Sequence, residues 1–270
     1  MTPSRWQIEQ LTFDDAAEGL TLSTEADWNQ TTADWTFLLR AGQGFGIRDG
    51  GRLVATSVAL PYPPDFGWVS MVLVTKDYRR QGLAATLLQS AFDFLLARNL
   101  VPMLDATPAG KAVYAPMGFE EVERIDRWFR PGSGQNAEDA VNIEPRASLD
   151  LAAFGADRAH LLKDIAARDG SLLIGGAAGY AVRRRGRLYS QIGPVVAENV
   201  EDARRLLRTI LAMSGEPLVI DVPARQAGVG AELAANGFSI QRPLYRMARN
   251  GPHGFGDLSL CFAIAGPEFG

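Results

Sequence analysis

Residues 72–84 read VLVTKDYRRQGLA, an apolar run followed by a basic turn and the start of a helical pattern. Unpaired amides and the helix dipole make the N-terminus of a helix attractive to anions. Gly82 and Ala84 keep bulky side chains away from this turn, so a phosphate can approach the backbone. Arg79 and Arg80 add positive charge. These features predict a strand–turn–helix unit that accepts a phosphate-bearing ligand.

An ordinary strand-to-helix turn with one glycine and two solvated arginines is the simplest alternative interpretation. The stretch has neither the lysine of a Walker A loop nor the spacing of a Gly-x-Gly-x-x-Gly fingerprint. Both absences argue against a nucleoside triphosphate or dinucleotide site.

Outward from this stretch, strand and helix patterns alternate through the first half of the chain. The predicted elements are helices over 14–30, 32–40, 82–98 and 108–117, and strands over 44–48, 53–60, 68–74, 101–106 and 119–130. Antiparallel strands followed by a right-handed strand–helix–strand crossover indicate an α+β sandwich, a mixed central sheet flanked by helices.

The second half of the chain repeats the pattern of the first. Four landmarks recur in the same order, at spacings of about 116 to 120 residues. They are a serine in a strand, a leucine in a helix, an aspartate that ends the next strand, and a glycine after the next helix. The pairs are Ser70 and Ser190, Leu88 and Leu207, Asp105 and Asp221, and Gly118 and Gly237. This repetition predicts a duplicated fold.

A composition shift separates the halves. Residues 131–147, PGSGQNAEDAVNIEPRA, contain several breakers, few large apolar side chains and no regular period. We therefore predict a first domain over 1–132, a linker over 133–146 and a second domain over 147–270.

The composition excludes several classes of protein. With 47% hydrophobic and 21% charged residues, the 270-residue chain can bury a large core. The net charge of −4 argues against a nucleic-acid partner. The chain has a single cysteine, Cys261, an acidic start and no long apolar run. We therefore predict a cytoplasmic protein without a membrane partner. His160 and His253 lie far apart without a nearby cysteine, so no metal site is expected.

Two motifs resemble the GNAT superfamily of N-acetyltransferases. The acetyl-CoA motif of that family, Arg or Gln, two residues, Gly, one residue, then Gly or Ala, is matched by residues 79–84, RRQGLA. The second signature, a tyrosine four residues before Gly-Phe, is matched by residues 114–119, YAPMGF, about 30 residues later. The resemblance covers residues 5–130 directly and 147–270 through the repeat, and it implies two tandem GNAT-like domains.

The resemblance implies a cofactor site for acetyl-CoA. Backbone amides of the turn would hold its pyrophosphate; the residues are Arg79, Arg80, Gln81, Gly82, Leu83, Ala84 and Ala85. The pantetheine arm would pair, like an added strand, with Val72, Leu73 and Val74. Thr107 stands where many relatives place an asparagine that contacts the cofactor, so this contact is either made by a hydroxyl or lost.

The resemblance also implies a catalytic residue and an acceptor side. Tyr114 would protonate the coenzyme A thiolate that leaves when a neutral amine attacks the thioester. The acceptor would enter near the first two predicted helices, where Trp28, Asn29 and Gln30 suit a polar small molecule or peptide amine. The alternative, of equal weight, is that Trp28 packs in the core and Asn29 caps the next helix. The candidates for a general base acting through water are Glu25, Asp27 and Asp105.

The sequence therefore predicts an acetyl-CoA-dependent N-acetyltransferase that acts on a primary amine. Its second domain is predicted to be degenerate, because the acidic stretch 198–202, ENVED, replaces the basic turn. The alternatives are a non-catalytic acyl-CoA-binding sensor or interaction module, and a structural domain without a cofactor. The sequence leaves the acceptor and the oligomeric state open.

Overall fold

The computed structural model describes residues 6–133, 147–249 and 255–270. The chain forms two compact units, Met1–Met103 and Leu104–Gly270, here the first and second unit. This division precedes the predicted boundary at 132, because the strand Phe119–Arg130 pairs with strands of the second half. Most of the predicted linker, residues 134–146, lies outside the described residues. The predicted domain limits stay a prediction.

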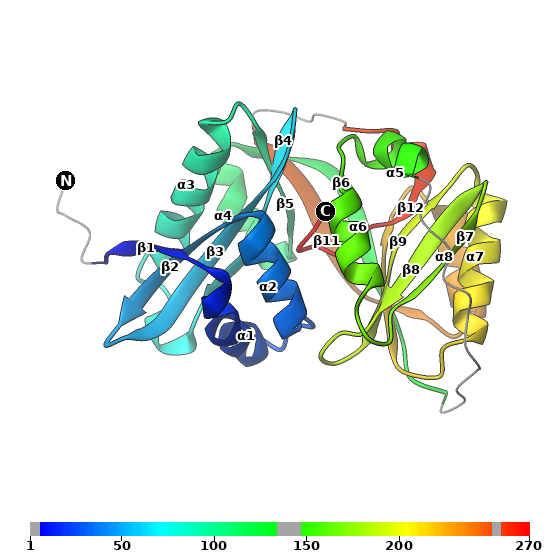
Figure 1. The fold of residues 1–270 in the computed structure, drawn as a ribbon, viewed down its shortest axis with the longest axis horizontal. Coiled ribbons are helices and arrows are strands. Elements are labelled where there is room, and N and C mark those ends of the chain that lie inside the picture. The colour runs from blue at the N-terminus through cyan, green and yellow to red at the C-terminus, as the bar shows by residue number, and fades with distance from the viewer. Residues whose placement is uncertain (1–5, 134–146, 250–254) are drawn as a thin grey trace. The chain divides into compact units, whose positions relative to one another are not determined.

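The first unit is built on a sheet in which neighbouring strands follow one another along the chain (Figure 1). Its strands are β1 (Ile8–Leu11), β2 (Gln43–Asp49), β3 (Arg52–Tyr62), β4 (Phe66–Val74) and the start of β5 (Val101–Ala106). Its helices are η1 (Phe13–Asp15), α1 (Ala16–Glu25), α2 (Thr32–Ala41), η2 (Lys76–Tyr78) and α3 (Leu83–Leu96). The predicted elements are present, except that the long first helix is shorter, and β1 is additional.

Helices cover both faces of this sheet. Side chains of a strand alternate between the two faces. On one face of β2, the Phe45 ring lies 6.1 Å from the Phe94 ring of α3. On the other face, a Cβ added at Gly44 would meet the Leu39 side chain of α2. The sheet is therefore sandwiched between α2 and α3, as the α+β prediction requires.

The second unit contains the remaining elements (Figure 1). They are the end of β5, α4 (Pro108–Tyr114), η3 (Ala115–Met117), β6 (Phe119–Arg130), α5 (Ala147–Phe154), α6 (Ala159–Ala166), β7 (Leu172–Gly176), β8 (Gly179–Arg184), β9 (Ser190–Ala197), α7 (Val200–Ala212), β10 (Leu218–Pro223), α8 (Ala227–Ala235), β11 (Ser239–Arg249), η4 (Leu258–Leu260) and β12 (Cys261–Ala263). Its strand order is β5-β11-β6-β10-β9-β8-β7, and β12 pairs with β9.

The structure confirms the duplicated fold. The sequence of elements β4-α3-β5-α4-β6 recurs as β9-α7-β10-α8-β11. The final strands of the two repeats are exchanged. β11 lies between β5 and β6, and β6 lies between β11 and β10. Each repeat thus places its last strand beside the penultimate strand of the other repeat.

Two buried ion pairs join the exchanged strands. Asp105 of β5 accepts two hydrogen bonds from Arg246 of β11, each 3.0 Å long. Asp221 of β10 accepts two from Arg127 of β6, each 2.7 Å long. Both carboxylate side chains are completely buried. Burial raises the pKa of Asp105, and the Arg246 charge opposes that shift.

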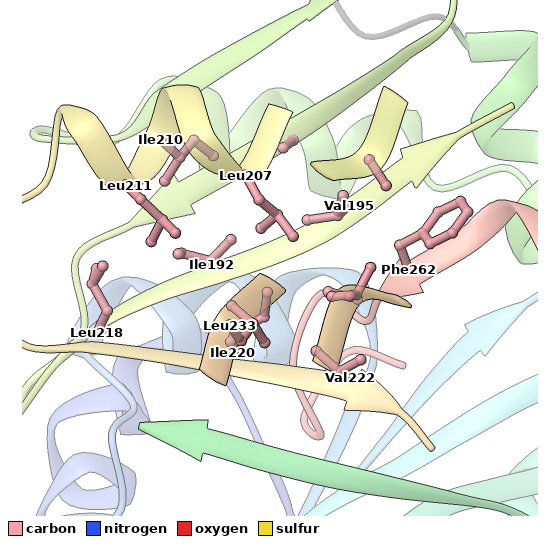
Figure 2. Close-up of a cluster of buried hydrophobic side chains, with 14 of the residues drawn as sticks. Ile192, Val195, Leu207, Ile210, Leu211, Leu218, Ile220, Val222, Leu233 and Phe262 are labelled. Carbon is pink, nitrogen blue, oxygen red and sulfur yellow. The ribbon is translucent and has the colours of Figure 1, made fainter. Parts of the chain in front are cut away.

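The core of the second unit lies between its helices and the strands β9 and β10. Leu207 and Ile210 of α7 face Ile192 of β9, and Leu233 of α8 faces Ile220 of β10 (Figure 2). All five side chains are completely buried. Burying each one contributes about 1.5–3 kcal/mol, so this cluster accounts for the helical periodicity of the second repeat.

Removing the arginine of a buried ion pair should lower the free energy of unfolding more than removing the arginine of an exposed pair. We expect Arg246→Met to lower the free energy of unfolding by about 3–5 kcal/mol, because Asp105 then keeps an uncompensated buried charge. Arg205→Met, which breaks the exposed pair with Asp202, should cost less than about 1 kcal/mol. Urea titrations measure both values.

A double-mutant cycle tests the cause. Asp105→Leu combined with Arg246→Met should recover most of the loss, since no charge is then left unpaired. Strictly additive losses would contradict the ion-pair explanation.

Candidate active site

The turn between β4 and α3 has the backbone conformation that its glycine predicts. Gly82 is the N-cap residue of α3 and has φ of 84°, in the left-handed region. A Cβ added there would meet no atom within 4 Å. The backbone conformation, rather than crowding by the protein, therefore favours glycine at this position.

The N-terminus of α3 lacks a side-chain cap. Among the described residues, no N-cap side chain accepts a hydrogen bond from the first amides of α3, and its first turn contains no acidic residue. The first amides of a helix have no partner within the helix. With the positive end of the helix dipole, they form a site that suits an anion.

A β-bulge bends β4 just before this turn. Ser70 lies opposite Val58, but the next registered residue, Leu73, lies opposite Thr56. Met71, inside the bulge, has φ of 51°, and its carbonyl accepts a 2.8 Å hydrogen bond from the Thr56 hydroxyl. Bulges twist a strand and often lie beside functional sites.

Beyond the bulge, β4 presents a backbone edge. β4 pairs with β5 only through its first three residues, Phe66–Trp68, opposite Val101–Met103. Thr75 donates its N–H to the Val54 carbonyl of β3. Because successive N–H groups of a strand alternate in direction, the Val74 N–H points away from β3. Arg79 reaches the same edge, where its Nε donates to the Val74 carbonyl at 3.1 Å.

Several contacts hold the turn in place. The Tyr78 hydroxyl donates to the Asp49 carboxylate at 2.7 Å. The Lys76 N–H donates to Glu25 at 2.9 Å, and Gln81 donates to the Asp77 carbonyl at 3.4 Å. The predicted residues of 72–74 and 79–85 thus follow one another on a single anchored strand–turn–helix.

Thr107 and Tyr114 belong to the second unit and mark the two ends of α4. The Thr107 hydroxyl is the N-cap and accepts a 3.1 Å hydrogen bond from the Gly110 N–H. Its own proton can still be donated. Its contact with a cofactor stays a prediction.

The Tyr114 ring is half-buried and lies 6.2 Å from the Phe119 ring. Burial raises the pKa of Tyr114 to about 12. The phenol is therefore protonated at neutral pH and can act as a hydrogen-bond donor. This is the state that a general acid requires.

Trp28, Asn29 and Gln30 lie between α1 and α2, with Gln30 buried and the other two half-buried. The alternative that Asn29 caps α2 is wrong. Thr31 is the cap, and it forms a capping box in which the Asp34 carboxylate accepts from the Thr31 N–H at 2.7 Å. The role of these three residues in binding an acceptor stays a prediction.

Two of the candidate general bases have structural partners. Glu25 accepts from the Lys76 N–H, and Asp105 pairs with Arg246. Asp27 is exposed and has φ of 55°. Asp105 is therefore better explained as an anchor of β5 than as a base.

The corresponding helix of the second repeat begins differently. Asn199 caps α7, and its Oδ1 accepts from the Glu201 and Asp202 N–H groups, each at 3.0 Å. Asn followed by acidic residues is a common N-cap pattern, which could have identified this cap in the sequence. Two of the first amides of α7 are therefore satisfied by the chain itself.

The part of the chain that the structure describes has neither a group of metal ligands nor a membrane-spanning helix. No three His, Cys, Asp or Glu side chains in this part of the chain are grouped to hold a metal ion. None of the helices described is both long enough and apolar enough to span a membrane.

Comparisons with known proteins give a consistent result. Residues 6–119 match the "Acetyltransferase (GNAT) family" model, and residues 147–262 match an "Acetyltransferase (GNAT) domain" model. The chain is 22% identical over 234 residues to an uncharacterized N-acetyltransferase of Bacillus subtilis strain 168, YitH, covering 81% of this chain and 83% of that relative.

Solved structures show the same fold. A putative acetyltransferase from Pyrococcus horikoshii has a TM-score of 0.84 at 18% identity, covering 100% of this chain and 98% of that one. A tandem GNAT protein from the clavulanic acid biosynthesis pathway has a TM-score of 0.63 at 16% identity, covering 93% of this chain and 100% of that one. With both repeats matched by the same family, the chain belongs to the GNAT acetyltransferases as a tandem, two-domain member.

Proposed function

We propose that this protein is an acetyl-CoA-dependent N-acetyltransferase that transfers an acetyl group to a primary amine of a small molecule or peptide. The observation that carries the proposal is the N-terminus of α3, which begins after Gly82 without a side-chain cap. It follows the turn that leaves the bulged strand β4. The family membership supports acyl transfer in general.

The cofactor would bind along this strand–turn–helix. Backbone amides at the start of α3 hold the pyrophosphate, and the exposed Arg79 and Arg80 add positive charge. The edge of β4 at Val72–Val74 pairs with the amides of the pantetheine arm, as a peptide does when it adds a strand to a sheet. Thr107 contributes its hydroxyl proton.

In the reaction, the lone pair of a neutral amine attacks the thioester carbonyl carbon. A carbon–nitrogen bond forms, the carbon–sulfur bond breaks, and the sulfur leaves with the electron pair. Tyr114 donates its hydroxyl hydrogen to this sulfur. The attacking nitrogen loses one proton, which restores the Tyr114 hydroxyl, so the amide, the thiol and the phenol are all neutral at the end.

The pKa of Tyr114 restricts how its proton moves. A thiol has a pKa of about 8.5, whereas that of Tyr114 is about 12, so complete transfer to sulfur costs about 5 kcal/mol. The hydroxyl therefore stabilises the developing thiolate by a hydrogen bond. It gives up its proton only as the proton of the attacking amine replaces it.

The cofactor site is tested by two glycines of similar geometry. Gly82 and Gly237 both have positive φ, 84° and 81°, and open space where a Cβ would lie. Replacing either with Val should cost stability by a similar amount, about 1–2 kcal/mol. Only Gly82→Val should weaken acetyl-CoA binding, because its branched side chain covers the approach to α3. Calorimetry that finds wild-type affinity in Gly82→Val would contradict the proposed site.

The catalytic residue is tested by removing one hydroxyl. Tyr114→Phe should lower kcat on the order of 10²-fold and leave the Kd for acetyl-CoA unchanged. Tyr189→Phe is the control and should keep full turnover. Thiol release over a panel of amines measures the rates. Full activity in Tyr114→Phe would mean that another group protonates the thiolate, and no turnover in the wild type would favour the acyl-CoA sensor.

The pH dependence provides a further test of Tyr114. Because its pKa is about 12, the phenol stays protonated as the pH rises through 10. We expect kcat to hold steady between pH 8 and 10, because even pH 10 is about two units below that pKa. A fall in kcat with a midpoint near pH 9 would contradict this role.

The number of cofactor sites distinguishes the two repeats. Full-length protein should bind one acetyl-CoA per chain, because Asn199 already satisfies the start of α7 and two acidic residues follow it. Like charges about 4 Å apart cost on the order of 1–4 kcal/mol, which opposes a pyrophosphate there. Two equivalent sites in a calorimetric titration would refute the degeneracy of the second repeat.

A further inference from the structure

The second repeat has the strand arrangement from which the proposed cofactor edge of the first repeat is built. β9 and β10 pair in parallel only over Ser190–Ile192 opposite Leu218–Ile220. Directly afterwards β9 is bulged, since Ile192 lies opposite Arg183 but the next registered residue, Val195, lies opposite Ala181. β4 and β5 show the same three-residue pairing followed by a bulge in β4.

In the second repeat, the chain itself fills the position beyond the bulge. β12 pairs antiparallel with the two residues after the bulge, Cys261 opposite Val196 and Ala263 opposite Val195. The next residue, Ile264, donates its N–H to the Asp221 carbonyl of β10 at 3.0 Å. This segment is therefore hydrogen-bonded to both strands after their mutual pairing ends.

A helix N-cap also contacts this segment. Gln226 is the N-cap of α8, and its side-chain amide donates to the Cys261 carbonyl at 2.9 Å. Thr107 holds the same place at the start of α4 in the first repeat. The position proposed to contact the cofactor in one repeat thus contacts β12 in the other.

The segment is a permanent part of the core. Phe262 of β12 is 3% exposed and belongs to the same cluster as Val195 and Val222 (Figure 2). A Cβ added at Gly193, in the bulge of β9, would lie only 2.0 Å from the Ile264 carbonyl oxygen. Truncating a buried phenylalanine costs about 3–5 kcal/mol, so β12 is not a lid that opens readily.

We propose that β12 is an internal substitute for the pantetheine arm, seated in the acyl-CoA groove of the second repeat. The inference rests on the proposed function, which places the pantetheine arm on the edge of β4. It assigns the occupant of the second groove as this chain's own segment Cys261–Ile264. The second repeat is then closed to acyl-CoA twice, by Asn199 at the helix and by β12 at the strand edge.

Hydrogen exchange of two amides in the full chain, followed by NMR with and without saturating acetyl-CoA, tests the proposal. The Ile264 amide should exchange slowly without the cofactor and change less than about twofold when it is added, because β12 already occupies the groove. The Val74 amide should slow by at least about tenfold on addition, because it gains a partner.

The exchange rates of the two amides distinguish a failure of the proposal about β12 from a failure of the proposed cofactor site. Fast exchange at Ile264 without the cofactor, or a clear change on its addition, would overturn the proposal about β12. A Val74 amide that ignores acetyl-CoA would instead refute the proposed cofactor site, and with it the equivalence of the two grooves.

A pair of glycine variants tests whether the position of β12 in the groove protects the Ile264 amide from exchange. Gly193→Ala should speed its exchange by at least about tenfold, because the added methyl meets the Ile264 carbonyl. Gly176→Ala, which adds a methyl in open space, should leave it unchanged. Equal exchange in both variants would also overturn the proposal, and the wild-type measurement stands if Gly193→Ala does not fold.

Discussion

The pairing of a buried aspartate with a buried arginine constrains how the exchanged strands of the second unit are arranged. A carboxylate without water needs a partner of opposite charge, and a bidentate arginine satisfies both of its oxygens. In each repeat the aspartate lies near the end of the penultimate strand, and its arginine comes from the last strand of the other repeat. The two pairs therefore fix which strands are neighbours and in which register. β5, whose end leads into α4 and Tyr114, depends on this constraint.

On this shared framework, small local differences support the proposal that only the first repeat accepts a cofactor. α3 begins at a left-handed glycine without a side-chain cap, whereas Asn199 satisfies the first amides of α7. The strand edge after the bulge also differs between the two repeats, and again the second repeat is the one whose groups are already paired. In the first repeat it carries the Val74 N–H directed away from β3, and in the second it pairs with β12. A duplicated fold thus supports one proposed site, with the other filled by the protein's own groups.

Local pattern explains which features were predictable. The elements around Gly82, the repeat and the glycine itself follow from neighbouring residues, and the structure confirms these elements and the repeat. The Thr31 cap was equally readable, because Thr-x-x-Asp is a capping-box pattern. The exchange of β6 and β11 was not readable, because Arg127 and Asp221 lie 94 positions apart and Arg246 and Asp105 lie 141 apart. No local spacing indicates which strand pairs with which across such distances. The seat of β12 depends on the same kind of long-range register.

The exchanged strands give the second repeat a structural role that does not depend on a cofactor site of its own. Without β11, the Asp105 carboxylate would lose Arg246 and keep a buried charge, and β5 would lose one of its two neighbours in the sheet. An unpaired strand edge and an uncompensated charge are both costly, the latter by about 3–5 kcal/mol. Because β5 leads into α4, that loss would reach the residues proposed to contact the cofactor and the leaving sulfur. If the proposed function holds, the second repeat therefore supports the reaction through β11, which stabilises the strand that leads into Thr107 and Tyr114.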